Sequence, residues 1–584
     1  MKKILLASMA LFLSAGVLFA QNNNATTEQN GSSNTAIQEQ YGDNNDASIQ
    51  QGYLKPADMW EQDGAYADQY QEGSFNKASI KQRGGGGDSW DDLNWSMQEQ
   101  YGYKNDAKVT IWNANNFSWQ YQEGDENVAK INISQHMNTV WQEQYGTMND
   151  AYTTTGGGSE NFAWTYQDGY KNMGFVKSKG SKNSAVLAQF GTENNGGNKP
   201  WWGDAIGPFP GHGGDGYDDF GILQLGDYNF AHTYQDGYKN KAFSVQEGNW
   251  NKEFITQFGD ENWAPIYQFG NANESNHFQS GTKNFALTYQ HGNGNKAAIT
   301  QVGSYNIGAQ MQGGVKDHGL TQMGNYNEAN ILQTGSYNTA VQIQAGAAFQ
   351  MGDYNVSDIK QTGMWNNAGA VQGDIFQKGN YNEIDIDQAG NYNNAMVSQM
   401  GNKNSATIKQ ASEMYPSDNR MHTQIQMGDE NDARAASYSD GNYGYQVQVG
   451  DNNLSILNQA GKDHQAYTYQ YGNDNKTAVK QHSAYGDTRN LTVVQVYGNE
   501  NDNHIEQDGS NNYTNLYVVG DGNVALSDPN SIWSDGIRQF GDNNVVNAYQ
   551  LGNMNTLTID QMSDMNNSMV IQNGDFNNSS VIQQ

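Results

Sequence analysis

Residues of two kinds alternate along this chain with a period of two, which is the pattern of a β-strand with two different faces. Between Gln290 and Gln301, one parity holds Asn295, Ala297 and Ile299, and the other parity is variable. The third position of the constant parity is often β-branched or apolar, as at Ile255, Ile266, Ile299, Ile331, Ile386, Val397, Ile408, Ile559, Val570 and Val581. We therefore expect the constant parity to face inward and the variable, often charged parity to face water.

The alternation belongs to a repeat of 11 residues that reads Gln-x-Gly-x-x-Asn-x-Ala-x-x-x. Chance does not hold such a register over nine successive glutamines, so the repeat is structural. The most regular glutamines are Gln224, Gln235, Gln246, Gln257, Gln268, Gln279, Gln290, Gln301 and Gln312. The glycines that follow them are Gly226, Gly237, Gly248, Gly259, Gly270, Gly281, Gly292 and Gly303, and the asparagines are Asn229, Asn240, Asn251, Asn262, Asn273, Asn284, Asn295 and Asn306.

The same repeat recurs towards the C-terminus and, less regularly, from Gln29 onward. Its further members include Gln333, Gln377, Gln388, Gln399, Gln539, Gln550 and Gln572, with Asn382, Asn393 and Asn404. Composition and repeat regularity predict these segments: a secretory signal peptide at 1–20, a polar and flexible Asn/Gln-rich lead-in at 21–28, irregular repeats at 29–195, a Gly/Pro/Trp-rich insert at 196–221, and regular repeats at 222–584 with short inserts near 411–423 and 523–537.

Each 11-residue unit is long enough for one short strand and one tight turn. Gly-x-x-Asn is the predicted turn, because glycine adopts backbone angles that other residues resist. Glycine and asparagine in every unit exclude a helical repeat. One strand cannot close on itself, so two units should form one rung. The predicted fold is an all-β solenoid of stacked strand–turn–strand rungs, about 22 residues each.

Stacking explains why glutamine and asparagine can face inward. A buried amide without a partner costs about 1–3 kcal/mol. An identical amide in the next rung can accept and donate in turn, which forms a ladder along the stack. The glutamines and asparagines named above are therefore the predicted structural ladder, and the glycines are the predicted turn positions. The alternative is that the glutamines lie on the surface of an ordinary repeat.

Composition and charge narrow the class of protein. The chain has 584 residues, 36% hydrophobic residues, no cysteine and a formal net charge of −31. A strongly acidic chain disfavours nucleic acid and anionic membranes as partners, since both need basic patches. The absence of cysteine excludes a disulfide scaffold and cysteine-based zinc sites.

The first 20 residues are typical of an export signal. Lys2 and Lys3 precede an apolar run from Ile4 to Phe19, and Ala20 precedes a polar segment. We expect cleavage after Ala20, with a retained N-terminal anchor as the alternative. No later segment is apolar enough to span a membrane, so none is expected after cleavage.

The ends of the predicted stack carry an expectation of their own. Roughly two dozen rungs at about 4.8 Å each would make a rod of about 100 Å or more. A bare rung exposes unpaired backbone groups and amides, which template another copy. Solenoids usually carry capping elements, but residues 570–584 still follow the repeat. This predicts end-to-end polymerisation.

The unit Gln-x-Gly-x-x-Asn-x-Ala-x-x-x-Gln, as at Gln290, Gly292, Asn295, Ala297 and Gln301, resembles the curlin repeat of curli subunits, which are bacterial functional amyloids. The resemblance implies a secreted, pilus-like fibre subunit that passes an outer-membrane secretion pore, polymerises with itself or related subunits, and serves cell adhesion and biofilm matrix. This chain departs from a typical member in its many more repeats, in carrying the motif in both halves of each rung, and in its long inserts.

No catalytic residue, cofactor site or metal site is predicted. The histidines, among them His277 and His291, are scattered without a recurrent partner. Turn carboxylates, as at Asp260, Asp429 and Asp542, could weakly hold Ca²⁺, although solvated turns that limit lateral clumping explain them as well. Outward aromatic residues could form binding stripes or simply support cross-strand packing.

Three functions remain open, and the fibre subunit is the leading hypothesis. A monomeric, surface-bound solenoid adhesin would bind carbohydrate or another surface without polymerising. A β-helix enzyme that degrades polysaccharide would need acids clustered by an insert, for which Asp218 and Asp219 are the candidates. Major subunit, nucleator and single rod are not distinguished by the sequence.

Overall fold

The structure is a computed structural model that describes residues 22–30, 33–55, 58–60, 64–83, 93–196, 221–312, 325, 327–344, 354–372, 379–410, 420–483, 489–525 and 536–584. Every regular element in these ranges is a β-strand. The described chain divides into two compact units, an N-terminal unit that ends at Trp250 and a C-terminal unit that begins at Asn251.

The N-terminal unit contains two parallel sheets whose strands alternate along the chain. Sheet A holds β1 (Asn24–Gln29), β3 (Asp46–Gln51), β7 (Lys77–Arg83), β9 (Asp106–Trp112), β11 (Val128–Ile133), β13 (Asp150–Gly156), β15 (Met173–Lys179), β17 (Asn195–Gly196), β18 (Ile222–Leu225) and β20 (Lys241–Glu247). Sheet B holds β2 (Thr35–Asp43), β6 (Tyr66–Ser74), β8 (Trp95–Tyr103), β10 (Phe117–Asp125), β12 (Thr139–Thr147), β14 (Phe162–Tyr170), β16 (Ser184–Thr192) and β19 (Phe230–Tyr238). A small antiparallel pair, β4 (Tyr53–Lys55) and β5 (Asp58–Trp60), lies outside both sheets.

The C-terminal unit repeats this arrangement. Its sheet A holds β22 (Trp263–Phe269), β24 (Phe285–His291), β26 (Ile307–Gln312), β28 (Thr339–Gln344), β30 (Asn367–Gln372), β32 (Asn394–Met400), β34 (Met421–Met427), β36 (Tyr443–Val449), β38 (Gln465–Tyr471), β40 (Leu491–Tyr497), β42 (Tyr513–Val519), β45 (Val545–Leu551) and β47 (Asn567–Asn573). Its sheet B holds β21 (Lys252–Asp260), β23 (Glu274–Thr282), β25 (Lys296–Ser304), β27 (Glu328–Ser336), β29 (Val356–Met364), β31 (Glu383–Ala389), β33 (Ser405–Gln410), β35 (Asp432–Ser437), β37 (Leu454–Ala460), β39 (Lys476–His482), β41 (Asp502–Asp508), β43 (Val524–Ala525), β44 (Ile537–Phe540), β46 (Thr556–Gln561) and β48 (Asn578–Gln583).

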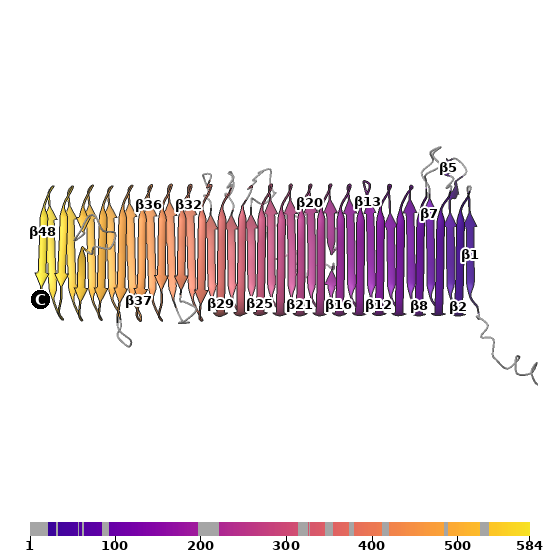
Figure 1. Ribbon diagram of the computed structural model, residues 1–584, viewed down its shortest axis with the longest axis horizontal. Coiled ribbons are helices and arrows are strands. Elements are labelled where there is room, and N and C mark those ends of the chain that lie inside the picture. Colours follow the sequence, from indigo (N-terminus) through magenta and orange to yellow (C-terminus); the bar gives the residue numbers. More distant parts are fainter. Residues whose placement is uncertain are drawn as a thin grey trace, which may run out of the picture. The chain divides into compact units, whose positions relative to one another are not determined.

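Successive strands of one sheet pair in parallel and in register, as the arrows within each unit in Figure 1 show. Phe117 of β10 pairs with Thr139 of β12, and Gln122 pairs with Gln144, 22 residues further on. One rung is therefore one strand of each sheet with its turns. This confirms the predicted β-solenoid with two half-repeats in each rung.

Alternation within the strands places the repeat's constant residues between the two sheets. In β10, buried residues alternate with partly exposed ones. In the C-terminal unit, Ile299, Ile331 and Ile359 are buried and form part of one apolar cluster. The period-two pattern thus sorts side chains between the interior and the outer sheet faces.

Inserted segments leave the register intact. β17 and β18 both pair with β15, although residues 197–220 separate them along the chain. β43 and β44 likewise both pair with β41. Most of the predicted inserts, together with Asp218, Asp219 and Gln377, lie outside the described residues.

Asn24–Gln29, which overlap the predicted lead-in, form β1 and pair with β3. Gln29 Nε2 donates to Gln51 Oε1 at 2.7 Å, and Asn24 Nδ2 donates to Asp46 Oδ1 at 3.0 Å. The segment lacks the complete motif but keeps a glutamine in the ladder register, and this is sufficient for strand pairing.

Candidate functional site

The glutamines of the repeat form hydrogen-bonded columns along each unit. In sheet B of the C-terminal unit, each Nε2 donates to the Oε1 of the next rung at 2.7–2.9 Å. This column runs through Gln257, Gln279, Gln301, Gln333, Gln361, Gln388 and Gln410. Every bond has the same direction, so the column has a donor end and an acceptor end.

A second hydrogen bond from each glutamine connects the two sheets. Gln290 Nε2 donates to Gln312 Oε1 at 2.7 Å and also to the carbonyl of Glu274, on the opposite sheet, at 2.9 Å. Gln268 does the same with Gln290 and Lys252. Both amide hydrogens therefore have acceptors, which offsets the cost of burying the side chain.

The remaining predicted glutamines that the structure describes lie in comparable columns. Gln224 donates to Gln246, and Gln189 donates to Gln235, in the N-terminal unit. Gln399 donates to Gln426. Gln539 donates to Gln561, and Gln550 donates to Gln572.

Some columns are interrupted, and the interruption leaves an acceptor without a donor. In β42, Val518 takes the column position before Gln550, and the buried Oε1 of Gln550 has no hydrogen-bond partner among the described residues. Ser437 stands before Gln459 in the same way, and the Gln459 Oε1 is likewise unpartnered within the described part of the chain. The fixed direction of the columns explains why the oxygen, and not the nitrogen, loses its partner.

The asparagines lock each turn to its neighbours. Asn251 Oδ1 accepts the backbone N–H of Asn273 at 3.1 Å, and Asn251 Nδ2 donates to the carbonyl of Gly270 at 2.8 Å. Corresponding bonds join Asn262 with Asn284, Asn284 with Asn306, Asn273 with Asn295, Asn382 with Asn404, Asn183 with Asn229, Asn194 with Asn240 and Asn366 with Asn393. One asparagine side chain thus satisfies backbone groups of the next rung.

The turn glycines are required by both conformation and space. Gly303 has a φ of +121°, and a Cβ at that position would lie 1.7 Å from the carbonyl oxygen of Gly335. At Gly226, Gly259, Gly270 and Gly281 the nearest carbonyl oxygen would lie 1.9–2.3 Å away. Gly237, Gly248 and Gly292 also have positive φ values. No side chain other than hydrogen fits where stacked turns approach so closely.

The residue directly before each asparagine is also left-handed, whatever its type. Tyr305 has a φ of +57° and Tyr337 a φ of +58°. Their exposed rings stack in parallel with centroids 4.8 Å apart, and the Tyr337 ring continues onto Trp365 at 4.3 Å. Positive φ is unusual for such residues. Sequence reasoning missed it because lysine, glutamate and aromatic residues all occupy this position.

Tyrosine and carboxylate alternate on the outer face of sheet B in the N-terminal unit. In β8, Glu99 precedes the column glutamine and Tyr101 follows it, whereas in β10 Tyr121 precedes it and Glu123 follows. The aromatic rings of successive strands form a series that we call the aromatic ladder, with neighbouring ring centroids 5.1–5.6 Å apart. Its members are Tyr41, Tyr70, Tyr101, Tyr121, Tyr145, Tyr166, Phe190 and Tyr234. The alternation keeps carboxylates from lying directly above one another. The signal was present in the alternating sequences Gln-Glu-Gln-Tyr-Gly and Gln-Tyr-Gln-Glu-Gly.

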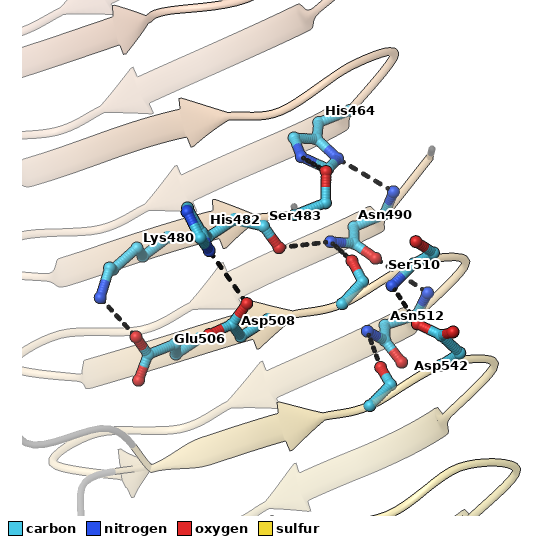
Figure 2. A network of polar contacts seen from close by, with 12 residues as sticks. His464, Lys480, His482, Ser483, Asn490, Glu506, Asp508, Ser510, Asn512 and Asp542 are labelled. Carbon is cyan, nitrogen blue, oxygen red and sulfur yellow. Dashed lines mark hydrogen bonds and ion pairs between the residues drawn. The ribbon is translucent and has the colours of Figure 1, made fainter. Parts of the chain in front are cut away.

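One histidine replaces an asparagine in the turn column, as Figure 2 shows. His464 Nδ1 accepts the backbone N–H of Asn490 at 3.1 Å, and the Asn490 Oδ1 accepts that of Asn512 at 2.9 Å. Burial lowers the pKa of His464 to about 4. Because the neutral ring supplies the acceptor, His464 has a structural role at this turn. His277 is also buried, with its Nε2 2.7 Å from the Thr288 hydroxyl.

Outside that column, Figure 2 shows polar side-chain pairs between neighbouring strands. Lys480 pairs with Glu506, and His482 Nδ1 lies 2.9 Å from Asp508 Oδ1. Partly exposed pairs of this kind contribute about 1 kcal/mol or less.

The turn carboxylates bind backbone groups. Asp429 Oδ1 accepts the N–H of Asn402 at 2.8 Å, and Asp542 Oδ1 accepts that of Ser510 at 2.7 Å. Among the described residues, no group of three or more His, Asp or Glu side chains is placed to hold a metal ion. The bonds to backbone N–H groups account for these carboxylates as turn-forming residues.

Comparison with known families identifies the repeat. The family model of the curlin associated repeat matches residues 20–52 and 379–411. Two segments of the chain therefore match the curlin associated repeat, and the family of that repeat is structural, not enzymatic. No curated protein matches the chain in a sequence search. The described part of the chain contains no helix that is long and apolar enough to cross a membrane.

Proposed function

We propose that the protein is a secreted structural subunit of an extracellular, curli-like amyloid fibre that serves cell adhesion and biofilm matrix. Copies of the chain add to one another at the open edges of the stacked rungs. The repeat family supports a curli-type subunit. The direction of the amide columns supports end-to-end addition, because the two edges carry complementary groups.

The edge formed by β47 and β48 is the observation that carries this proposal. Within the described residues, no strand pairs with the outer side of β48, and its residues alternate between exposed and partly exposed. The side chains of Met565, Phe576 and Ile582 are 78%, 75% and 64% exposed. An unpaired strand edge with apolar side chains is a template for pairing with another chain.

The edge formed by β1 and β2 offers the matching half. Gln561 Nε2 donates to Gln583 Oε1 at 2.8 Å, which leaves Gln583 as the last donor of its column. Gln40 is the first member of the sheet B column at the other edge and donates to Gln71. Gln583 Nε2 of one copy would therefore donate to Gln40 Oε1 of the next.

The turn columns have the same complementarity. The backbone N–H of Asn577 donates to Asn555 Oδ1 at 2.9 Å, so the Oδ1 of Asn577 faces outward along the column. Asn34 Oδ1 already accepts the N–H of Ala65, so its backbone N–H faces the opposite way. Docking one copy on the next would join Asn34 N–H to Asn577 Oδ1.

Seeded assembly of the purified chain without its leader tests this proposal. We expect elongation on preformed seeds and cross-β diffraction near 4.8 Å along the fibre axis. Gln583→Glu removes the terminal donor and sets a carboxylate against an acceptor, so elongation should slow about tenfold or more. Gln495→Glu adds the same charge on the outer face of β40 and should leave the rate unchanged. A persistently monomeric protein, or equal rates for the two variants, would contradict the proposal.

A second candidate, a monomeric surface adhesin, is supported by one observation. Exposed aromatic rings stack along the turns of the C-terminal unit, including Tyr337, Trp365 and Tyr392. Such rings could bind carbohydrate without polymerisation. Retention of the wild-type monomer on an insoluble polysaccharide, lost in Trp365→Ala, combined with no seeded growth, would favour this candidate.

A further inference from the structure

Six of the seven tyrosines in the N-terminal unit's aromatic ladder form an unbroken series. Tyr41, Tyr70, Tyr101, Tyr121, Tyr145 and Tyr166 follow one another on successive strands of sheet B. Neighbouring centroids are 5.2–5.6 Å apart, and neighbouring planes are inclined by 38–41°. Each pair joins two different rungs, since no strand contributes two members.

Carboxylates accept the phenol hydrogens of this series. Tyr70 Oη donates to Glu72 Oε2 at 2.9 Å, and Tyr121 Oη donates to Glu123 Oε2 at 2.9 Å. The hydrogen bond to Glu72 is the main reason that the pKa of Tyr70 is raised to about 12. The Tyr70 phenol is therefore protonated at neutral pH, and both Tyr70 and Tyr121 have a proton acceptor in place.

We propose that this tyrosine ladder is an oxidative modification site, at which dityrosine bonds covalently join neighbouring rungs. The oxidant is hydrogen peroxide used by a haem peroxidase. The proposal goes beyond the fibre function and does not depend on it, because all six rings belong to one chain.

The chemistry balances with that oxidant. Two neighbouring phenols each lose the hydroxyl hydrogen, as one electron to the oxidant and one proton to the facing carboxylate or water. The two radicals couple through the ring carbons next to the hydroxyl-bearing carbons, and the two ring hydrogens move to the oxygens to restore both phenols. One peroxide takes up the two electrons and two protons and becomes two waters, so each bond removes two hydrogen atoms from the protein.

Phe190 limits the series. It lies between Tyr166 and Tyr234 with centroids 5.1 and 5.3 Å from them. A phenyl ring has no hydroxyl hydrogen to lose, so Tyr166 and Tyr234 cannot be linked through it. The expected linked pairs are therefore 41–70, 70–101, 101–121, 121–145 and 145–166.

The test treats the full chain with a haem peroxidase and hydrogen peroxide. A mixture of ordinary and ¹⁵N-labelled chains is used, and linked peptides are mapped by mass spectrometry after unfolding in strong acid. We expect the five ladder pairs, each two hydrogen atoms lighter than its separate peptides and each within one isotope type. Phe190→Tyr should add links to Tyr166 and Tyr234.

Matched variants make the outcome decisive. Y70F/Y121F/Y166F keeps every ring but leaves no two adjacent tyrosines in the ladder, so all five pairs should be lost. Y103F/Y170F/Y238F removes three exposed tyrosines outside the ladder and should keep all five. Strand content measured by circular dichroism checks that both variants fold. No ladder pairs in the wild type, pairs that join only chains of different isotope type, or loss of the five pairs in Y103F/Y170F/Y238F would overturn the proposal.

Discussion

The two units build the same rung with their interiors exchanged between the sheets. In the N-terminal unit, sheet B carries a second amide column two residues before the first, through Gln69, Gln98, Gln120 and Gln142, with bonds of 2.7–2.8 Å. Opposite it, sheet A carries Ile80, Val109 and Ile131. In the C-terminal unit, sheet B carries the apolar column of Ile299, Ile331 and Ile359, whereas sheet A carries Gln310 and Gln342, which are hydrogen-bonded at 3.0 Å.

This exchange shows which property of the interior is fixed. Over the rungs named above, each of these columns consists of one kind of residue, and the amide column faces the apolar column. The sheet that carries the amide column differs between these rungs of the two units. A uniform column satisfies its own members, by hydrogen bonds in one case and by apolar contact in the other.

The glycine columns are common to both units, so their loss should have the largest effect and should not distinguish the units. Gly102→Ala in the N-terminal unit would place a Cβ 2.1 Å from the Gly124 carbonyl oxygen. Gly303→Ala is its counterpart in the C-terminal unit. We expect each to destabilise its rungs by about 4 kcal/mol or more, measured by hydrogen exchange of the neighbouring amides.

The control for this prediction is Gly369→Ala. A Cβ at Gly369 would meet no atom within 4 Å. Because the residue lies in a strand, the change should be neutral or slightly stabilising. A small effect of Gly303→Ala would mean that the turns can separate, and would remove space as the reason for glycine.

Exchanging single residues between the two kinds of column should have the next largest effect. Ile331→Gln places an amide between two isoleucines and should cost about 2–5 kcal/mol. Gln120→Ile leaves the donor of Gln98 and the acceptor of Gln142 unpaired, at about 1–3 kcal/mol for each. The free energy of unfolding in guanidinium chloride measures both.

The combined change sharpens this comparison. Replacement of the whole second column, which begins at Gln38, by isoleucine at 38, 69, 98, 120 and 142 leaves no amide of that column unpaired, so its cost should be less than the sum of the five single changes. Strict additivity would show that each glutamine acts alone, and would contradict the idea of a uniform column.

The smallest expected effect concerns pH and is confined to one turn of the C-terminal unit. The folded state keeps His464 neutral, with a pKa of about 4 against 6.5 when exposed. Its contribution to stability is therefore present above pH 6.5 and lost as the pH falls through about 4. Hydrogen exchange of the Asn490 amide should speed up over that range, after correction for intrinsic rates.

The matched variant is His464→Asn, which restores the residue found elsewhere in the turn column. Its Asn490 amide should stay protected at low pH. An equal loss of protection in the variant would assign the acid sensitivity to other groups.

Periodicity is the reason why the fold could be predicted from the sequence. A register of 11 residues fixes which side chains face inward, and the turn residues fix where each strand ends. The second amide column could not be predicted from the repeat consensus. The position two residues before the column glutamine holds glutamine in the N-terminal unit, as at Gln120, and isoleucine in the C-terminal unit, as at Ile299. Counting 22 residues from Asn442 would have placed His464 in the asparagine column.

The left-handed backbone before each asparagine could not be predicted from residue type. Left-handed residues before the asparagines include Lys283 and Glu261 as well as Tyr305, so only their position marks them. That the columns serve as an assembly site remains a prediction, since the hydrogen bonds within one chain describe stability and not partner binding. The Gln583 variant separates the two.

The alternation of tyrosine and carboxylate has a consequence for how such a gene can change in length. Its true period is two rungs, because Tyr101 and Glu99 exchange places in the next strand as Tyr121 and Glu123. Deletion or duplication of one rung would set glutamate upon glutamate at the junction, where like charges about 5 Å apart repel. Copy number in this part of the chain should therefore change most readily in steps of two, which makes the heritable module a pair of rungs.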